Sequence, residues 1–125
     1  MQPTLTPKLA PYIVVQKDGP GLAHFLEKAL GGQVTFQQTS PDGGLAHMEV
    51  QIADGLVMIG ESPDGARAFP AMVHLYVPDP DAAYRTALEA GASSVRPVTD
   101  TPDGLRRGGV KDAWGNEWWF SRLPK

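Results

Sequence analysis

The chain contains no cysteine among its 125 residues. This absence excludes disulfide bonds, thiolate nucleophiles and thiolate metal sites. No apolar run approaches the roughly 20 residues of a membrane-spanning helix, and residues 1–8 carry no apolar secretion core, so we expect a cytoplasmic protein with no membrane partner. Basic residues form no cluster: the net charge is −3, and Arg106 and Arg107 are only a pair. We therefore expect no nucleic-acid partner.

Glycine and proline, in contrast, are plentiful. Fourteen glycines and twelve prolines fit many short connections rather than long helices. The hydrophobic content of 42% and the length suit one globular domain with a core of its own.

The predicted secondary structure runs through the same order twice: strand, helix, then three strands. The first copy has strands at 11–16, 33–39, 45–53 and 56–60, with a helix from Pro20 to Leu30; the second has strands at 71–77, 94–98, 105–111 and 117–121, with a helix from Asp79 to Gly91. Val15 and Val77 end equivalent strands, and Gly31 and Gly91 end equivalent helices, about sixty residues apart in each case. A long period with two copies indicates a duplicated βαβββ module.

Each predicted helix has a start signal and an apolar face. Pro20 suits the first helical position after Asp18 or Gly19 as cap, and Asp79 precedes Pro80 in the same way. The apolar residues recur at helical spacing, which predicts one buried face for each helix. These faces comprise Leu22, Phe25, Leu26, Ala29 and Leu30 in the first helix, and Ala83, Tyr84, Ala87 and Leu88 in the second.

The last predicted hairpin carries the most distinctive motif, Gly-Gly-Val-Lys-Asp-Ala-Trp-Gly-Asn-Glu-Trp-Trp-Phe at residues 108–120. Gly115 can take the positive φ that such a turn often needs. The run Asp-x-x-Gly-Asn-x-Trp beside a Gly-Gly-Val strand resembles the closing hairpin of the glyoxalase/bleomycin-resistance/dioxygenase (vicinal oxygen chelate) superfamily. Ala-His-Met-Glu-Val at 46–50, Asp-x-Asp-Ala-Ala-Tyr at 79–84 and Arg-Gly-Gly-Val-x-Asp at 107–112 are similar to its small PhnB-like members.

The resemblance covers roughly residues 10–122 and implies an α+β fold. Two tandem βαβββ modules would form a curved eight-stranded sheet with a cleft, usually in a homodimer. On this basis the chain is a single glyoxalase-like domain, with module one at about 10–61, a linker at 62–70 and module two at about 71–122.

The resemblance also implies where a metal would bind, because metal-dependent members take His, Glu, Gln or Tyr ligands from the first and last strands of each module. Those positions fall near residues 10–12, Met58, Met72 and Trp119, and of these only Tyr12 could donate an oxygen, if the register favours it. Methionine and tryptophan offer no hard donor, and a two-residue shift of register would add at most His74 and Glu117. That is fewer than the three protein ligands of a catalytic zinc site. We therefore expect no metal and no cofactor; zinc, nickel, manganese or iron would be the candidates otherwise.

Two strands carry candidate polar groups. His47, Glu49 and Gln51 alternate with Ala46, Met48, Val50 and Ile52, which leaves the polar face either solvated or lining the cleft. His47 and Glu49 point the same way and can couple, so a general base is one interpretation. His74 shares a face with Met72 and Tyr76, and is either a histidine at the edge of the core or a polar group in the cleft.

Aromatic residues provide the second set of candidates. Trp119 with Glu117 is expected to face the cleft, and Trp118 with Phe120 to pack on the helix. Either all three tryptophans are structural, or Trp119 joins an aromatic and polarizable lining suited to a flat or cationic ligand. That lining would comprise Tyr12, Met58, Met72, Tyr76 and Trp119, with Phe36 and Phe69 added. Arg106 and Arg107 alternate, so one of them should point inward. They are either a surface pair near Glu or Asp, or they provide an anion contact at the rim of the cleft.

Two classes of function fit these patterns. The first is a metal-free binding protein that holds a small hydrophobic or aromatic ligand in an apolar cleft, as the bleomycin-resistance type does. The alternative is a metal-dependent enzyme of the glyoxalase or dioxygenase type: a lyase, an isomerase, a thiol transferase or a ring-cleaving dioxygenase. A metal-free enzyme with His47 or His74 as base, and Glu49 or Glu117 as its partner, is a further alternative.

Overall fold

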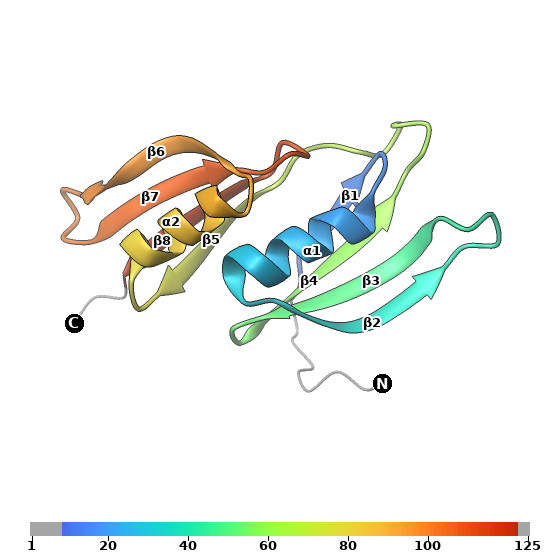
Figure 1. Ribbon diagram of the computed structural model, residues 1–125, viewed down its shortest axis with the longest axis horizontal. Coiled ribbons are helices and arrows are strands. Elements are labelled where there is room, and N and C mark those ends of the chain that lie inside the picture. The colour runs from blue at the N-terminus through green and yellow to red at the C-terminus, as the bar shows by residue number, and fades with distance from the viewer. Residues whose placement is uncertain (1–8, 123–125) are drawn as a thin grey trace. The chain divides into compact units, whose positions relative to one another are not determined.

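The computed structural model describes residues 9–122, which divide into two compact units between Pro70 and Ala71. We call the unit up to residue 70 module one and the unit from residue 71 module two. Each is a βαβββ module with a four-stranded sheet of its own (Figure 1). The predicted α+β class and the tandem βαβββ modules are confirmed.

Module one comprises β1 (Tyr12–Val15), α1 (Gly19–Leu30), β2 (Gln33–Thr39), β3 (Leu45–Ile52) and β4 (Gly55–Glu61). The strand order in its sheet is β1-β4-β3-β2. β1 runs parallel to β4, and the other neighbours are antiparallel. Because α1 connects β1 to the far edge strand β2, it crosses one face of the sheet and packs on β2, β3 and β4.

The start and the end of α1 follow the sequence signals. The Asp18 carboxylate accepts a hydrogen bond from the Gly21 amide, and Pro20 stands in the first turn. Gly31 ends the helix with a φ of 67°. The apolar face packs on the sheet through side chains that are nearly or fully buried: Leu22, Phe25, Leu26 and Ala29 from α1, and Ile13, Val15, Met48, Val50 and Ile59 from the strands.

Module two repeats this arrangement with β5 (Met72–Val77), α2 (Pro80–Glu89), β6 (Ser93–Asp100), β7 (Arg106–Lys111) and β8 (Glu117–Arg122). The strand order is β5-β8-β7-β6, and β5 runs parallel to β8. The Asp79 carboxylate caps α2 through the Ala82 amide at 3.1 Å. The predicted turn before β8 is present, and Gly115 has a φ of 89°.

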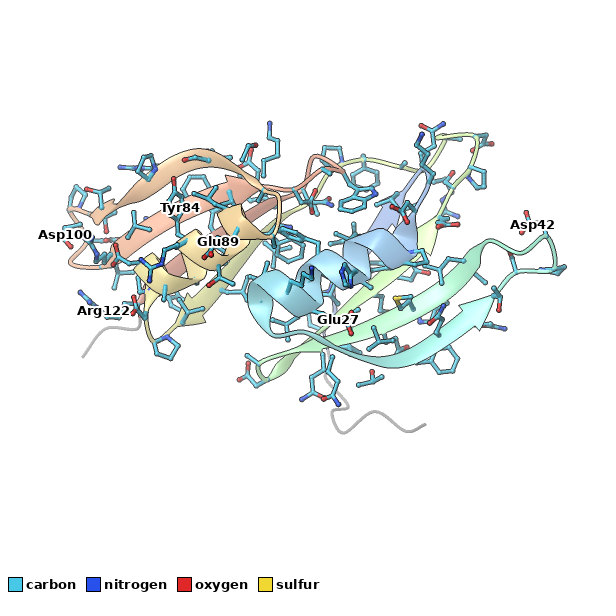
Figure 2. All side chains as sticks on the ribbon, in the orientation of Figure 1. Glu27, Asp42, Tyr84, Glu89, Asp100 and Arg122 are labelled. Carbon is cyan, nitrogen blue, oxygen red and sulfur yellow. The ribbon has the colours of Figure 1, made fainter. Side chains whose placement is uncertain are left out.

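The predicted burial of α2 is partly wrong. Ala87 is fully buried, whereas Ala83, Tyr84 and Leu88 are only half-buried. Tyr84 lies beside β6 because its hydroxyl donates a 2.6 Å hydrogen bond to Ser94 Oγ (Figure 2). α2 consists largely of small and polar residues, so it covers less of its sheet than α1 does.

One further detail differs from the prediction. Ala46 was expected on the same face as Met48, but the pairing of β2 with β3 shifts between Gln38 and Thr39, so Leu45 is buried and Ala46 is exposed. Residues 62–70 form an ordered loop, in which the Ser62 amide donates to the Val15 carbonyl and Phe69 forms a backbone bridge with Val14.

Each sheet therefore has one face covered by its helix and one face without a helix, which we call the open face. Strand pairing defines both open faces. In module one, Met58 lies opposite Tyr12 on one side and Glu49 on the other. In module two, Trp119 lies between His74 and Gly109 in the same way. No helix in residues 9–122 is long and apolar enough to cross a membrane.

Candidate functional site

A chain of hydrogen bonds crosses the open face of module one. The Tyr12 hydroxyl lies 2.9 Å from Nδ1 of His47, and Nε2 of His47 lies 2.9 Å from the Glu49 carboxylate. Strand alternation places His47 and Glu49 two residues apart on β3, and Tyr12 reaches them from β1. The structure thus joins three of the predicted site residues in one network.

When the His47 imidazole is neutral, the groups at the two ends of the network, Tyr12 and Glu49, determine which nitrogen carries the ring proton. A carboxylate only accepts hydrogen bonds, so Nε2 of His47 carries the ring proton and donates it to Glu49. Nδ1 then has a free lone pair and accepts the hydroxyl proton of Tyr12. The Tyr12 oxygen keeps its own lone pairs for a hydrogen bond from outside the network.

Aromatic and thioether groups surround the network. The His47 ring lies between those of Tyr12 and Phe36, with centroids 5.4 Å and 5.8 Å away. Met58 is half-buried between Tyr12 and Glu49. Gly60 lets the Tyr12 ring lie flat on the sheet, because a Cβ at this position would stand 2.9 Å from the Tyr12 hydroxyl oxygen.

A cavity of about 600 Å³ adjoins the network in module one. It is lined by Tyr12, Val14, Ala46, Glu61, Arg67 and Phe69, among others. Tyr12 is the member of the network that lines it, and His47 and Glu49 are linked to the cavity through Tyr12. The Glu61 carboxylate is already held by the amides of Gly19 at 2.7 Å and Leu45 at 2.9 Å.

The loop at residues 62–70 builds one wall of this cavity, which the sequence analysis missed by treating it as a linker. Ser62, Ala66, Arg67 and Phe69 all line it. Asp64 shapes the loop by accepting hydrogen bonds from the Ala66 amide at 2.9 Å and the Ser62 hydroxyl at 3.0 Å. The same two bonds, the first one foremost, lower the pKa of Asp64. An Asx-type Ser-x-Asp pattern was the available sequence signal.

The open face of module two carries a second network, which joins His74, Ser121 and Arg107. Nε of Arg107 donates to Ser121 Oγ at 3.0 Å, and Ser121 Oγ lies 2.7 Å from Nε2 of His74. Arginine can only donate, so Ser121 Oγ accepts from Arg107 and keeps its own proton and a second lone pair. When Nε2 of His74 is unprotonated, the Ser121 hydroxyl donates to it, and the imidazole is neutral.

The charges around His74 agree with a neutral ring. Partial burial lowers the pKa of His74, and the positive charge of Arg107 lowers it further. Arg107 is in turn paired with Asp103 at 2.9 Å. The Thr101 hydroxyl and Arg107 bring the pKa of Asp103 to about 2.

The other predicted residues of module two lie along the same open face. Met72, His74 and Tyr76 are exposed on β5, and Glu117 and Trp119 are half-buried on β8. The Glu117 carboxylate accepts a 2.9 Å hydrogen bond from the Trp119 indole rather than joining His74. Trp118 and Phe120 are fully buried.

The two networks occupy matching positions of the repeat. Since Met58 corresponds to Trp119 in the registers above, Tyr12 corresponds to His74, and His47 to Arg107. In module one, Tyr12 on β1 bonds directly to His47 on β3, and Gly60 on the strand between them has no side chain in the way. In module two Ser121 stands at the matching position and bridges His74 and Arg107. The module-one network ends on the Glu49 carboxylate, and the module-two network continues through the Arg107 guanidinium to Asp103.

Comparison with known proteins follows the fold. Residues 8–120 match the model of the Glyoxalase/Bleomycin resistance protein/Dioxygenase superfamily. The chain belongs to this superfamily. Its relatives include uncharacterized proteins of Mycobacterium bovis and Mycobacterium tuberculosis, each 32% identical over 123 residues; the alignment covers 90% of this chain and 80% and 72% of theirs.

Solved structures share this fold. TioX from Micromonospora sp. ML1 is 23% identical with a TM-score of 0.78, and the match covers 94% of this chain and 98% of TioX. A glyoxalase/bleomycin resistance protein from Catenulispora acidiphila is 26% identical with a TM-score of 0.67, covering 93% and 97%.

Two of the residues that the resemblance places at metal positions do not suit a divalent ion. Met58 offers a thioether, and the Trp119 indole can only donate a hydrogen bond. In the register found here, Met72 lies opposite Glu117 and His74 opposite Trp119, so His74 and Glu117 do not face each other across the strands. Within residues 9–122, no three His, Cys, Asp or Glu side chains gather in a way that could hold a metal ion. The expectation of a metal-free site stays a prediction.

Proposed function

We propose that this protein binds a small hydrophobic or aromatic molecule on its open faces and needs no metal to do so. The observation that carries this proposal is the exposure of large apolar side chains in each module. In module one, Phe69 is 71% exposed and Tyr12 47%, and both line the cavity. In module two, Met72 is 70% exposed and Tyr76 54%, both on β5. Exposed apolar groups beside a cavity are typical of ligand sites.

The polar groups of the two faces support the same function. The side chains that could provide specificity are paired with one another in the two networks, so they are already held in place before a ligand arrives. The cytoplasmic location, the homodimer and membership of the PhnB-like subgroup belong to this proposal as further expectations.

A ligand screen by tryptophan fluorescence tests the proposal. We expect a neutral aromatic compound to change the emission in a saturable way, with or without a chelator. Tyr12→Ala or Met72→Ala should weaken the binding, whereas Leu9→Ala should not, because Leu9 is exposed but belongs to no strand.

Elemental analysis separates the proposal from a metal-dependent enzyme. The purified protein would be analysed before and after soaking with zinc, nickel, manganese and iron(II). Metal far below one ion per chain supports the proposal. A stoichiometric ion that is required for ligand binding would contradict it.

A further inference from the structure

We propose that Tyr12, His47 and Glu49 form a proton acceptor for a bound aromatic molecule that carries an ionisable hydroxyl group. This inference rests on the proposed function, since it names the class of ligand for the open face of module one. It goes further because it assigns the network a chemical step.

Position gives each residue a distinct role. Tyr12 lines the cavity, and in this scheme its oxygen is the atom that meets the ligand. Its hydroxyl proton is directed to Nδ1 of His47 at 2.9 Å, which leaves the oxygen lone pairs as acceptors. A ligand must therefore offer a hydrogen to this oxygen. Ethers and ketones of the same shape offer none and would leave it unpaired.

The proton transfer balances without any co-reactant. The O–H bond of the ligand breaks, and Tyr12 Oη takes the proton. The proton that Tyr12 already held passes to Nδ1 of His47. The ligand keeps the electron pair as its conjugate base, and the imidazolium remains bonded to the Glu49 carboxylate through Nε2. No group is oxidised or reduced.

The surroundings favour the charges that this step creates. The new imidazolium lies 2.9 Å from a carboxylate, and both side chains are largely shielded, with 23% and 18% of their surface exposed. Arg67 lines the cavity and places a positive charge near the anionic ligand. The Glu61 carboxylate lines the same cavity, but two backbone amides already bind it. His47 and Glu49 act through Tyr12 and are positioning residues in this scheme.

The probe pair 2-naphthol and 2-methoxynaphthalene tests the inference, because the two differ in the hydroxyl hydrogen. The full-length chain, in excess over the probe, should bind 2-naphthol about fivefold more tightly, which is the effect of one neutral hydrogen bond. Excitation outside the tryptophan absorption makes 2-naphthol a strong acid, so transfer to the network should produce naphtholate emission from the bound probe.

Four variants separate binding from proton transfer. Tyr12→Phe should remove both the preference for 2-naphthol and the naphtholate emission. His47→Gln and Glu49→Gln should keep the binding preference and reduce the emission, because a hydrogen bond to Tyr12 or His47 can still form without the base or its counter-charge. Tyr84→Phe removes a hydroxyl that bonds Ser94 in module two, and should change neither readout.

Three outcomes would overturn the inference. Equal affinity for both probes, with no naphtholate emission above that of Tyr12→Phe, would leave a binding face that takes up no proton. Naphtholate emission that persists in both His47→Gln and Glu49→Gln would assign the proton to another acceptor. No saturable binding of either probe would count against the proposed function as well. Circular dichroism of each variant checks that the fold is kept.

Discussion

Asp112 is the buried carboxylate around which the last hairpin is built. One of its oxygens accepts hydrogen bonds from the amides of Trp114 and Asn116, both at 2.9 Å, and the other accepts from the Trp118 indole at 2.8 Å. Asn116 also reaches back to bind the Ala71 amide through its side-chain oxygen. The motif that resembles the superfamily in the sequence therefore stabilises the last hairpin of module two.

Replacing this carboxylate should be costly. In Asp112→Asn, the side-chain amide turns a donor toward other donors and leaves a buried group unsatisfied, so we expect a loss of about 2–4 kcal/mol in the free energy of unfolding. Urea denaturation measures it. Asp54→Asn is the matched control, because Asp54 is exposed in the turn between β3 and β4. A loss equal to that of the control would contradict this account of the hairpin.

His74 gives a second prediction at this scale, and its sign follows from the lowered pKa. Burial and Arg107 depress the pKa below the ordinary 6.5, so between the depressed value and 6.5 the unfolded chain binds more protons than the folded chain. Stability should therefore fall as the pH drops through this window. On the open face, the charged groups of the other strands nearby are Arg107 and Lys111 on β7 and Glu117 on β8.

An NMR titration of the imidazole signals checks this directly. We expect the pKa of His74 to lie below 6.5 in the native chain and to rise in Arg107→Gln, which removes the nearby positive charge. In His74→Gln, the matching part of the acid loss of stability should disappear. A pKa at or above 6.5 in the native chain would show that the network does not hold His74 neutral.

Among the elements, the end of β4 joins three parts of module one. The Glu61 carboxylate accepts hydrogen bonds from the first residue of α1, Gly19, and from the first residue of β3, Leu45. A negative charge at a helix N-terminus also interacts favourably with the helix dipole. Glu61 thus fixes the start of α1 relative to the strands that border the cavity.

Glu61→Gln should lower the free energy of unfolding by about 1–2 kcal/mol, because the charged acceptor becomes a neutral one and one of the two amides loses its partner. Thermal or urea unfolding measures the change. Glu89→Gln is a suitable control, because Glu89 is exposed in the last turn of α2 (Figure 2). An unchanged stability in Glu61→Gln would mean that water replaces the carboxylate without loss.

The elements themselves could be predicted from the sequence, because each one has a strong local signal. Alternation gave the strands, and Asp18, Asp79 and Gly31 marked where helices begin and end. His47 and Glu49 could be placed on one face for the same reason. What local signals do not contain is tertiary geometry. The β-bulge that exposes Ala46 depends on pairing with β2.

The candidate site, too, could be predicted only where it depends on local spacing. Residue spacing predicted that His47 and Glu49 would interact, but their bond to Tyr12 depends on the register between β1 and β4 and on the bare surface at Gly60. Ser121 was missed although it continues the alternation of Glu117 and Trp119. Its role depends on His74 and Arg107, which reach it from two other strands. The loop at 62–70 has a polar composition, which says nothing about the wall it forms.

At the scale of the whole molecule, the two modules are unequally buried. Of the buried apolar side chains within residues 9–122, fourteen belong to module one and four to module two. Every residue of β6 is exposed except Val98, which is half-buried. Burial of apolar surface is the main favourable contribution to folding. The core of module two therefore contributes less stability than the core of module one.

Hydrogen exchange should therefore distinguish the modules. We expect the amides of β3 and β4, whose side chains form the core of module one, to exchange more slowly than those of α2, where most side chains are only half-buried or exposed, and of β6, where most are exposed. Exchange followed by mass spectrometry at several protein concentrations gives the measurement. If the chain forms the expected homodimer through module two, protection of α2 or β6 should rise with concentration. Equal protection of both modules at low concentration would show that the few buried residues of module two, led by Trp118 and Phe120, are enough to stabilise it.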